Sequence, residues 1–127
     1  MNKYYNTDDV NSMFGIKIPW ALVQDKVFKG ISPTGKLLYG VISDLIEIAE
    51  MNNLRDKDGK SYVNFNLKYL ADIFDMSEDE MNKYVSELTD VDGKGNGLIL
   101  IKQVDGQTRI YMYRFGDIYK FLKGKMR

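Results

Sequence analysis

The chain is 127 residues long and carries 18 basic and 18 acidic side chains, for a formal net charge of zero; this length suits one domain with a hydrophobic core. Cysteine and histidine are absent; this excludes disulfides and thiolate or imidazole ligands and removes the usual general base, so we expect no enzyme, metal or cofactor. No apolar run approaches membrane-spanning length and the N-terminal stretch lacks an apolar signal segment, so we expect a cytoplasmic protein without membrane contact.

The charges are unevenly distributed along the sequence. Residues 1–93 contain 10 basic and 16 acidic side chains, whereas residues 94–127 contain 8 basic and 2 acidic ones. Such asymmetry indicates a surface that meets a polyanion, or else a chance distribution over solvated faces.

The N-terminal stretch is predicted to hold little regular structure. Residues 1–13 are polar and mostly without periodicity, which indicates a flexible arm. Residues 14–18 alternate around two isoleucines and end at Pro19, so we expect a short edge strand or an extended lead-in. Residues 19–23 suit one helical turn, in which Trp20, the only tryptophan, is expected to be a core or partly buried anchor.

Residues 30–36 read GISPTGK and resemble the start of a phosphate-binding Walker loop. That loop requires Ser or Thr next, to bind Mg²⁺, where this chain has Leu37, and it must follow a buried parallel strand. We instead predict a helix from Pro33 to about Met51, with Ser32 as its N-cap and Pro33 in the first helical position. Its wide apolar stripe is typical of a central core helix, part of which could lie in a subunit interface.

The next segment is predicted to be a turn followed by a strand. Residues 56–59 resemble the middle of a calcium loop, but Leu54 and Phe65 stand where the first and last ligands would be. We therefore predict a turn at this point and a short strand over residues 61–65.

Two helices separated by a tight turn are predicted next. Residues 66–75 place apolar side chains at helical spacing behind Asn66, a suitable N-cap. Ser77 and Glu80 fit a capping box, in which the Ser77 side chain accepts from the Glu80 amide and the Glu80 carboxylate accepts from the Ser77 amide. The helix that follows has one apolar face, formed by Met81, Tyr84, Val85 and Leu88.

The last third is predicted to hold a hairpin and a short helix. A mobile glycine-rich loop over residues 92–97 leads into two strand-like runs joined by Asp105 and Gly106, a strong signal for a type I′ turn. Residues 117–123 suit a short amphipathic helix with Ile118, Phe121 and Leu122 inward, followed by a basic end.

This element order predicts an α+β winged helix-turn-helix, with three main helices, a small antiparallel sheet, a wing hairpin and a short C-terminal helix. We expect a flexible arm over residues 1–13 and a winged-helix domain over residues 14–115. A short basic C-terminal helix and tail would then occupy residues 116–127.

Five short segments support a more specific resemblance, which covers roughly residues 14–115. They are Phe14 to Pro19, Ile31 to Gly40, Asp58 to Phe65, Gly97 to Ile99, and Arg109 to Tyr111. In this order and spacing they resemble the N-terminal domain of the plasmid replication initiator A family. The resemblance implies a winged-helix DNA-binding domain that recognises repeats at a replication origin, often as a dimer. Such initiators usually carry a further C-terminal domain, so we expect either an excised domain or a truncated stand-alone relative.

One feature departs from that family. Its recognition helix usually begins with basic residues, whereas this chain has Glu78, Asp79 and Glu80 there. Acidic residues in a first helical turn are favoured by the helix dipole, but they repel a phosphate backbone. If DNA binds, the wing, the glycine-rich loop and the basic tail must supply the electrostatic affinity.

Two functional hypotheses follow. In the first, the chain binds duplex DNA, with Asn82 reading adenine, Lys83 contacting guanine or phosphate, and Ser86 beside them on the exposed helix face. Further contacts are then expected from the wing, the loop and the preceding helix, namely Lys102, Gln107, Arg109, Lys94 and Lys68. In the second, the winged helix binds a basic protein partner through Glu78, Asp79 and Glu80, as a regulator or inhibitor of a nucleic-acid-handling protein. Salt-sensitive binding to duplex DNA is required only by the first.

Overall fold

The computed structural model describes Asp8 and residues 15–124. The rest of the arm expected over residues 1–13 lies outside the described residues, as do Phe14 and residues 125–127. Within the described part, no helix is both long enough and apolar enough to cross a membrane.

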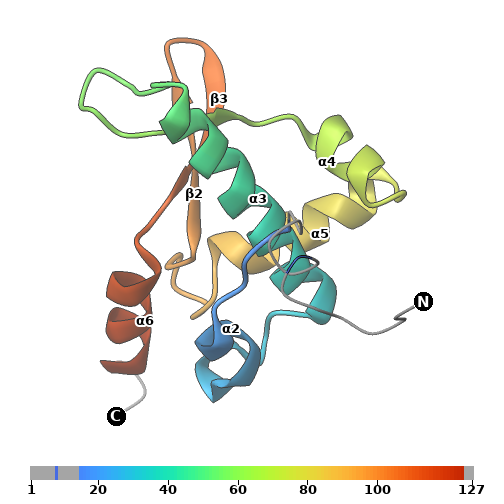
Figure 1. Cartoon of the computed structure of the whole chain (residues 1–127). Coiled ribbons are helices and arrows are strands. Elements are labelled where there is room, and N and C mark those ends of the chain that lie inside the picture. Colours follow the sequence, from blue (N-terminus) through green and yellow to red (C-terminus); the bar gives the residue numbers. More distant parts are fainter. Residues whose placement is uncertain (1–7, 9–14, 125–127) are drawn as a thin grey trace.

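A long central helix, α3 (Pro33–Met51), crosses the molecule and contacts the second helix of the helix-turn-helix and two strands of the sheet (Figure 1). As predicted, Ser32 is its N-cap, with its hydroxyl accepting from the Gly35 amide at 3.0 Å, and Pro33 occupies the first helical position. Before it come the one-turn helix α2 (Trp20–Gln24) and the 3₁₀ helix η1 (Lys26–Phe28). Its buried side chains include Leu38, Tyr39 and Ile42, which confirms a core helix.

The helix-turn-helix consists of α4 (Leu67–Ile73) and α5 (Glu78–Thr89). Asn66 caps α4 by accepting from the Tyr69 amide at 3.0 Å, and Ser77 caps α5 by accepting from the Glu80 amide at 3.1 Å. These caps were predicted from the sequence. The return bond of the capping box, from the Ser77 amide to the Glu80 carboxylate, is not formed between these two described residues.

The sheet has three antiparallel strands in the order β1-β3-β2: β1 (Val63–Asn64), β2 (Ile99–Val104) and β3 (Gln107–Met112). Both residues of the wing turn are left-handed, Asp105 with φ 51° and Gly106 with φ 78°, as a type I′ turn requires. In this register Ile101 lies opposite Ile110 on the face toward α3 and α5. The opposite face, which we call the outer face, carries the facing pairs Leu100 with Tyr111 and Lys102 with Arg109.

The lead-in is not a strand. Residues 15–19 belong to no sheet, and they run across α3 instead. A Cβ on Gly40 of that helix would come within 2.9 Å of Ile16 and 3.0 Å of Ile18, so the glycine makes room for the crossing. Of the two sequence expectations, the extended lead-in is therefore the one that holds.

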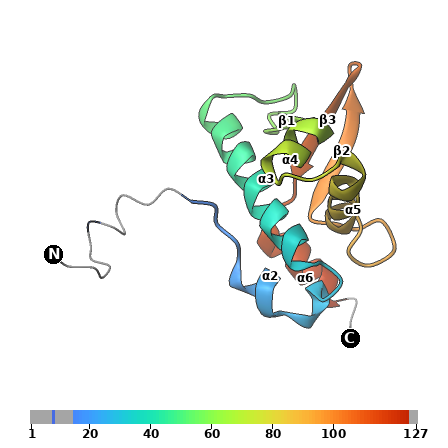
Figure 2. The same ribbon diagram turned by 90° about the vertical axis from the view of Figure 1, so that its right-hand side faces the viewer.

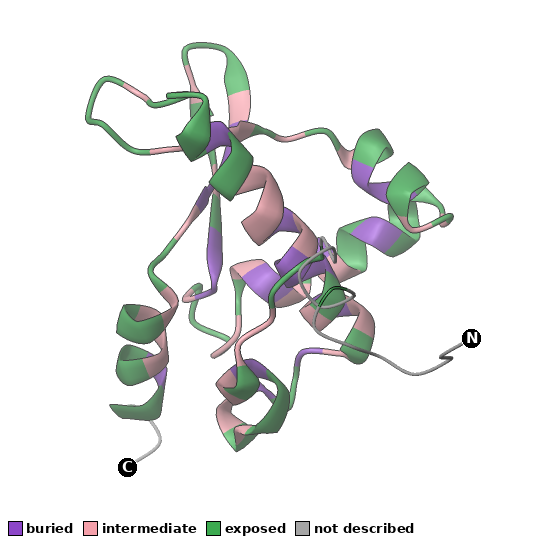
Figure 3. Ribbon diagram, in the orientation of Figure 1, coloured by how far each residue is buried: buried purple, intermediate pink, exposed green. Residues whose placement is uncertain are grey.

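Two predicted core positions are wrong. Trp20 is 75% exposed, because the five-residue helix α2 buries only one side, and Leu22 occupies that side. Phe121 is 47% exposed, whereas Leu122 on α6 (Phe115–Gly124) is buried as expected. Figure 3 shows the buried segments of α3, α5 and the sheet where these elements face one another.

Helix α6 is fastened to the N-terminal elements. The rings of Phe115 and Tyr119 lie 5.7 and 5.6 Å from the ring of Phe28 in η1. The Tyr119 hydroxyl donates to the Asp25 carboxylate, which also pairs with Lys123 at 3.2 Å. The C-terminal helix thereby packs on the same core as the winged helix.

Candidate nucleic-acid interface

Helix α5 separates a buried face from an exposed one. Met81, Val85 and Leu88 are at most 3% exposed and fix the helix on the core. The three predicted contact residues of this helix, Asn82, Lys83 and Ser86, all lie on the exposed side. The Ser86 hydroxyl donates to the Asn82 main-chain carbonyl at 2.9 Å, so it is already engaged along the helix. Figure 2 shows α4 and α5 in front of the core, with the wing projecting beyond them.

The C-terminal part of α5 is held against the start of α3 by Glu87. Its carboxylate accepts from the Ser32 hydroxyl at 2.8 Å and from the Ser32 amide at 3.1 Å. A Cβ on Gly35 would come 2.3 Å from the same oxygen, so the glycine leaves the space that Glu87 fills. The segment that resembles a Walker loop therefore has the chain's own carboxylate at its helix N-terminus, where a phosphate would otherwise bind.

The first turn of α5 is acidic and open to solvent. Glu78, Asp79 and Glu80 are all exposed, and within the described residues none of them forms an ion pair. Lys68 on α4 is exposed and pairs with Asp72 at 3.1 Å. An exposed pair of this kind stabilises the fold by little, about 0.5 kcal/mol, so its ammonium group can exchange partners easily.

The wing presents two of its three predicted contacts to solvent. Lys102 and Gln107 are exposed. The expectation for Arg109 as an open wing residue is wrong, because its side chain is only 9% exposed. Its guanidinium lies 3.9 Å from the ring centroid of Tyr62 and donates to the Gln107 side chain at 3.2 Å. Strand β1 causes this: it pairs with β3 and brings Tyr62 onto the outer face beside Arg109.

The glycine-rich loop is organised by aspartates. Asp92 accepts from the amides of Lys94 and Asn96, and Asp90 accepts from the amide of Gly95. Lys94 is exposed, as predicted, and borders a cavity of about 340 Å³. Lys26 and Lys29 line the same cavity, and the sequence reasoning missed both. They are 65 or more positions from Lys94 in the chain, so no local pattern could have joined them.

The arrangement as a whole is a winged-helix domain with a candidate nucleic-acid interface on α5, the wing and the glycine-rich loop. The sequence model for the N-terminus of replication initiator protein A matches residues 14–121. The chain belongs to this family.

Several solved structures have similar folds, three of which are described in turn. The "N-Terminal domain of DNA binding protein" has a TM-score of 0.68 and 21% identity, and the match covers 98% of this chain and 96% of that one. The "Structure of MDR initiator" gives 0.67 and 20%, covering 97% and 98%. The "Structure of Rep-DNA complex" gives 0.65 and 20%, covering 97% and 95%. At these identities the likeness establishes the fold. A comparison with curated proteins gives no match.

Proposed function

We propose that this domain binds duplex DNA and recognises repeats at a replication origin, with α5 in the major groove. The observation that carries the proposal is the exposed row of Asn82, Lys83 and Ser86 on the second helix of a winged-helix domain from an initiator family. A Rep–DNA complex among the structures of similar fold supports it.

The side chains on α5 have the chemistry for reading bases. An asparagine amide can bond in bidentate fashion to adenine, and a lysine ammonium can donate to guanine O6 and N7. Asn82 and Lys83 supply these groups next to each other on the exposed face. Recognition of a repeat would bring two copies of the domain onto neighbouring sites, so we also propose dimeric binding. Sedimentation of the complex on one-repeat and two-repeat duplexes tests the stoichiometry.

The affinity would come from basic residues around α5, because the first turn of this helix repels phosphate. Lys102 and Gln107 on the wing and Lys68 on α4 would contact the backbone on one side. Lys94, with Lys26 and Lys29 around the same cavity, would contact it on the other side.

Fluorescence anisotropy with a randomised duplex pool tests the proposal. We expect binding that weakens linearly in the logarithm of salt concentration and enrichment of a repeat-like site from the pool. Asn82→Ala with Lys83→Ala should reduce the preference for the enriched site over the pool by at least tenfold. Lys57→Ala is the control, because Lys57 is exposed on the loop before β1. No binding at 50 mM salt would refute the proposal.

A second candidate function rests on the acidic first turn of α5. Glu78, Asp79 and Glu80 form an exposed anionic surface that a basic protein partner would fit. The partner could be a nucleic-acid-handling protein that this domain regulates. Calorimetry with a lysine- and arginine-rich peptide tests the idea against Glu78→Gln/Glu80→Gln. Tight duplex binding that the peptide does not compete with would argue against this role.

A further inference from the structure

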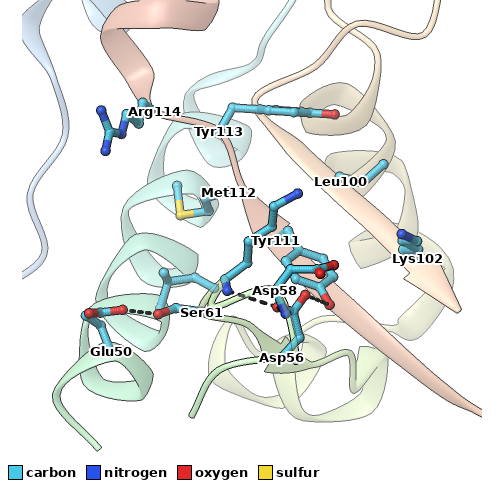
Figure 4. Close-up of a pocket in the computed structure, with 12 residues that line it drawn as sticks. Glu50, Asp56, Asp58, Ser61, Leu100, Lys102, Tyr111, Met112, Tyr113 and Arg114 are labelled. Atoms are coloured by element: carbon cyan, nitrogen blue, oxygen red, sulfur yellow. Dashed lines mark hydrogen bonds between the residues drawn. The ribbon is translucent and has the colours of Figure 1, made fainter. Parts of the chain in front are cut away.

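The outer face of the wing sheet borders a cavity that shares only Lys102 with the proposed duplex contacts. Its volume is about 520 Å³, within the range that small ligands occupy. Leu100, Lys102 and Tyr111 border it from the sheet, Tyr113 and Arg114 from the segment between β3 and α6, and Asp58 from the loop before β1 (Figure 4). Because side chains alternate along a strand, these sheet residues point away from α5.

We propose that this cavity binds single-stranded DNA, taking one unpaired base against Tyr113 and its phosphate at the neighbouring cations. The proposal concerns a second surface and does not depend on how α5 is used.

The apolar part of the cavity suits a flat aromatic ligand. Tyr113 is 45% exposed and Leu100 is 39% exposed, so both offer apolar surface to a ligand. The Tyr113 amide donates to the Leu98 carbonyl at 3.3 Å, which ties the backbone of Tyr113 to the start of the wing. Figure 4 shows the Tyr113 ring spread along one border of the cavity. Every base has a face that stacks on such a ring.

The cavity is lined by three carboxylates and three basic side chains, and two of the carboxylates are held by hydrogen bonds. Glu50 is bound to Arg55 and to the Ser61 hydroxyl. Asp56 accepts from the Tyr111 hydroxyl at 3.0 Å and from the amides of Asp58 and Lys60. These hydrogen bonds hold the Asp56 pKa below its ordinary value, and the bond from the Lys60 amide has the largest effect. Both carboxylates are therefore already satisfied.

Two of the basic side chains, Lys102 and Arg114, by contrast form no ion pair within the described residues. Lys102 also faces Arg109 directly across the two strands, so two positive side chains are neighbours on this face. A phosphate bound at Lys102 would gain from the positive charge on this face. Asp58 remains as a carboxylate that can accept from the exocyclic amine of cytosine or adenine.

An unpaired base is required because a duplex hides the surfaces that this cavity would bind. In B-DNA each base face is covered by its neighbours, so Tyr113 could stack only on a base that has left the helix. A single strand meets that condition along its whole length, and it also supplies the phosphate. Together the ring and the cations form a stacking platform with backbone contacts, as single-strand-binding surfaces do.

The test is anisotropy of the full chain with labelled single-stranded dC and dT 12-mers. Tyr113→Ala should weaken dC binding about tenfold. Lys102→Ala should weaken it severalfold and lower the salt slope by about 0.7. Tyr69→Ala and Lys57→Ala are matched controls, because Tyr69 is a 50% exposed tyrosine on α4 and Lys57 is an exposed lysine, and neither borders the cavity. Both controls should stay within twofold of the wild type.

The remaining measurements distinguish a single strand from a free nucleotide as the ligand. Binding of the 12-mer at least tenfold tighter than binding of dCMP would support a strand, whereas equal affinities would assign the site to a free nucleotide and overturn the single-strand proposal. Because the Asp58 carboxylate is the proposed acceptor for the cytosine amine, Asp58→Ala should remove the preference for dC over dT, and a preference that survives would overturn this contact. Equal losses in the cavity variants and the controls, or no binding at 50 mM salt, would overturn the single-strand proposal as well. Duplex binding measured in parallel separates the two surfaces, because Tyr113→Ala should leave it unchanged whereas Lys102→Ala, which removes a proposed wing contact, should weaken both.

Discussion

The two ends of α5 carry carboxylates in opposite surroundings. At the N-terminal end, Glu78, Asp79 and Glu80 are exposed, and their negative charges are stabilised by the helix dipole. At the C-terminal end, Glu87 is half-buried and accepts two hydrogen bonds from Ser32, 55 positions earlier. The same residue type therefore fixes the fold at one end and shapes the surface potential at the other.

The comparison also separates the two flanks of the candidate interface. The acidic end of α5 repels a phosphate backbone, whereas the loop after its other end brings Lys94 beside Lys26 and Lys29. A duplex across α5 would therefore be held at the C-terminal end of the helix more strongly than at its N-terminal end.

The largest effect is expected where the chain leaves α5. A Cβ on Gly97 would come within 2.3 Å of the Leu88 carbonyl oxygen and of the Thr89 carbonyl carbon, both backbone atoms that cannot rotate away. Gly97→Ala should therefore lower the free energy of unfolding by about 3 kcal/mol. Gly116→Ala is the control, because a Cβ there meets nothing within 4 Å. Urea denaturation of both variants measures the difference, and equal midpoints would contradict the close approach at Gly97.

The next effect separates the carboxylates of the two ends directly. Glu87→Ala leaves the Ser32 amide and hydroxyl without their acceptor and should lower the free energy of unfolding by about 2 kcal/mol. Glu78→Ala removes only a favourable dipole interaction, so its cost should be about 0.5 kcal/mol. Thermal and urea unfolding of the two variants test the contrast. Similar losses would mean that Glu87 does not hold α5 on α3.

A third effect concerns binding at the acidic end. Glu78→Lys with Glu80→Lys should strengthen non-specific duplex binding by roughly tenfold at low salt, because repulsion from the backbone becomes attraction. Glu47→Lys with Asp117→Lys changes the net charge equally at exposed positions on α3 and α6. If both double variants gain the same affinity in anisotropy titrations, the effect belongs to net charge and α5 does not face DNA.

These contrasts also show which parts of the molecule local sequence signals can predict. Ser77 as a helix cap and the Asp105–Gly106 turn depend on a few neighbouring residues, and both were predicted correctly. The buried face of α5 follows from helical spacing alone. The order of these elements predicted the winged-helix fold, and the family resemblance agreed with it.

The failures arise from the way in which the elements pack on one another. Trp20 was expected inside, but Leu22 takes the only buried side of a one-turn helix. Arg109 was expected outside, but β1 brings Tyr62 over its guanidinium. Spacing along the sequence carries no signal for the bond between Glu87 and Ser32 either. Burial of a single side chain depends on which elements pack around it, so periodicity predicts faces better than individual positions.

The smallest effect expected is a pH dependence where η1 and α6 meet, beside the Lys26 and Lys29 cavity. The hydrogen bond from the Tyr119 hydroxyl, then those from the Val27 amide and Lys123, hold the Asp25 pKa at about 2, below its ordinary 3.8. Because folding lowers this pKa, the ionised carboxylate stabilises the fold above pH 4, and that contribution is lost as the pH falls through 2. The difference in urea midpoint between wild type and Asp25→Asn should therefore shrink from pH 5 to pH 2. Tyr119→Phe, which removes the strongest donor, should show a smaller pH dependence than the wild type. A midpoint difference that stays constant over this range would show that the carboxylate charge does not hold α6 in place.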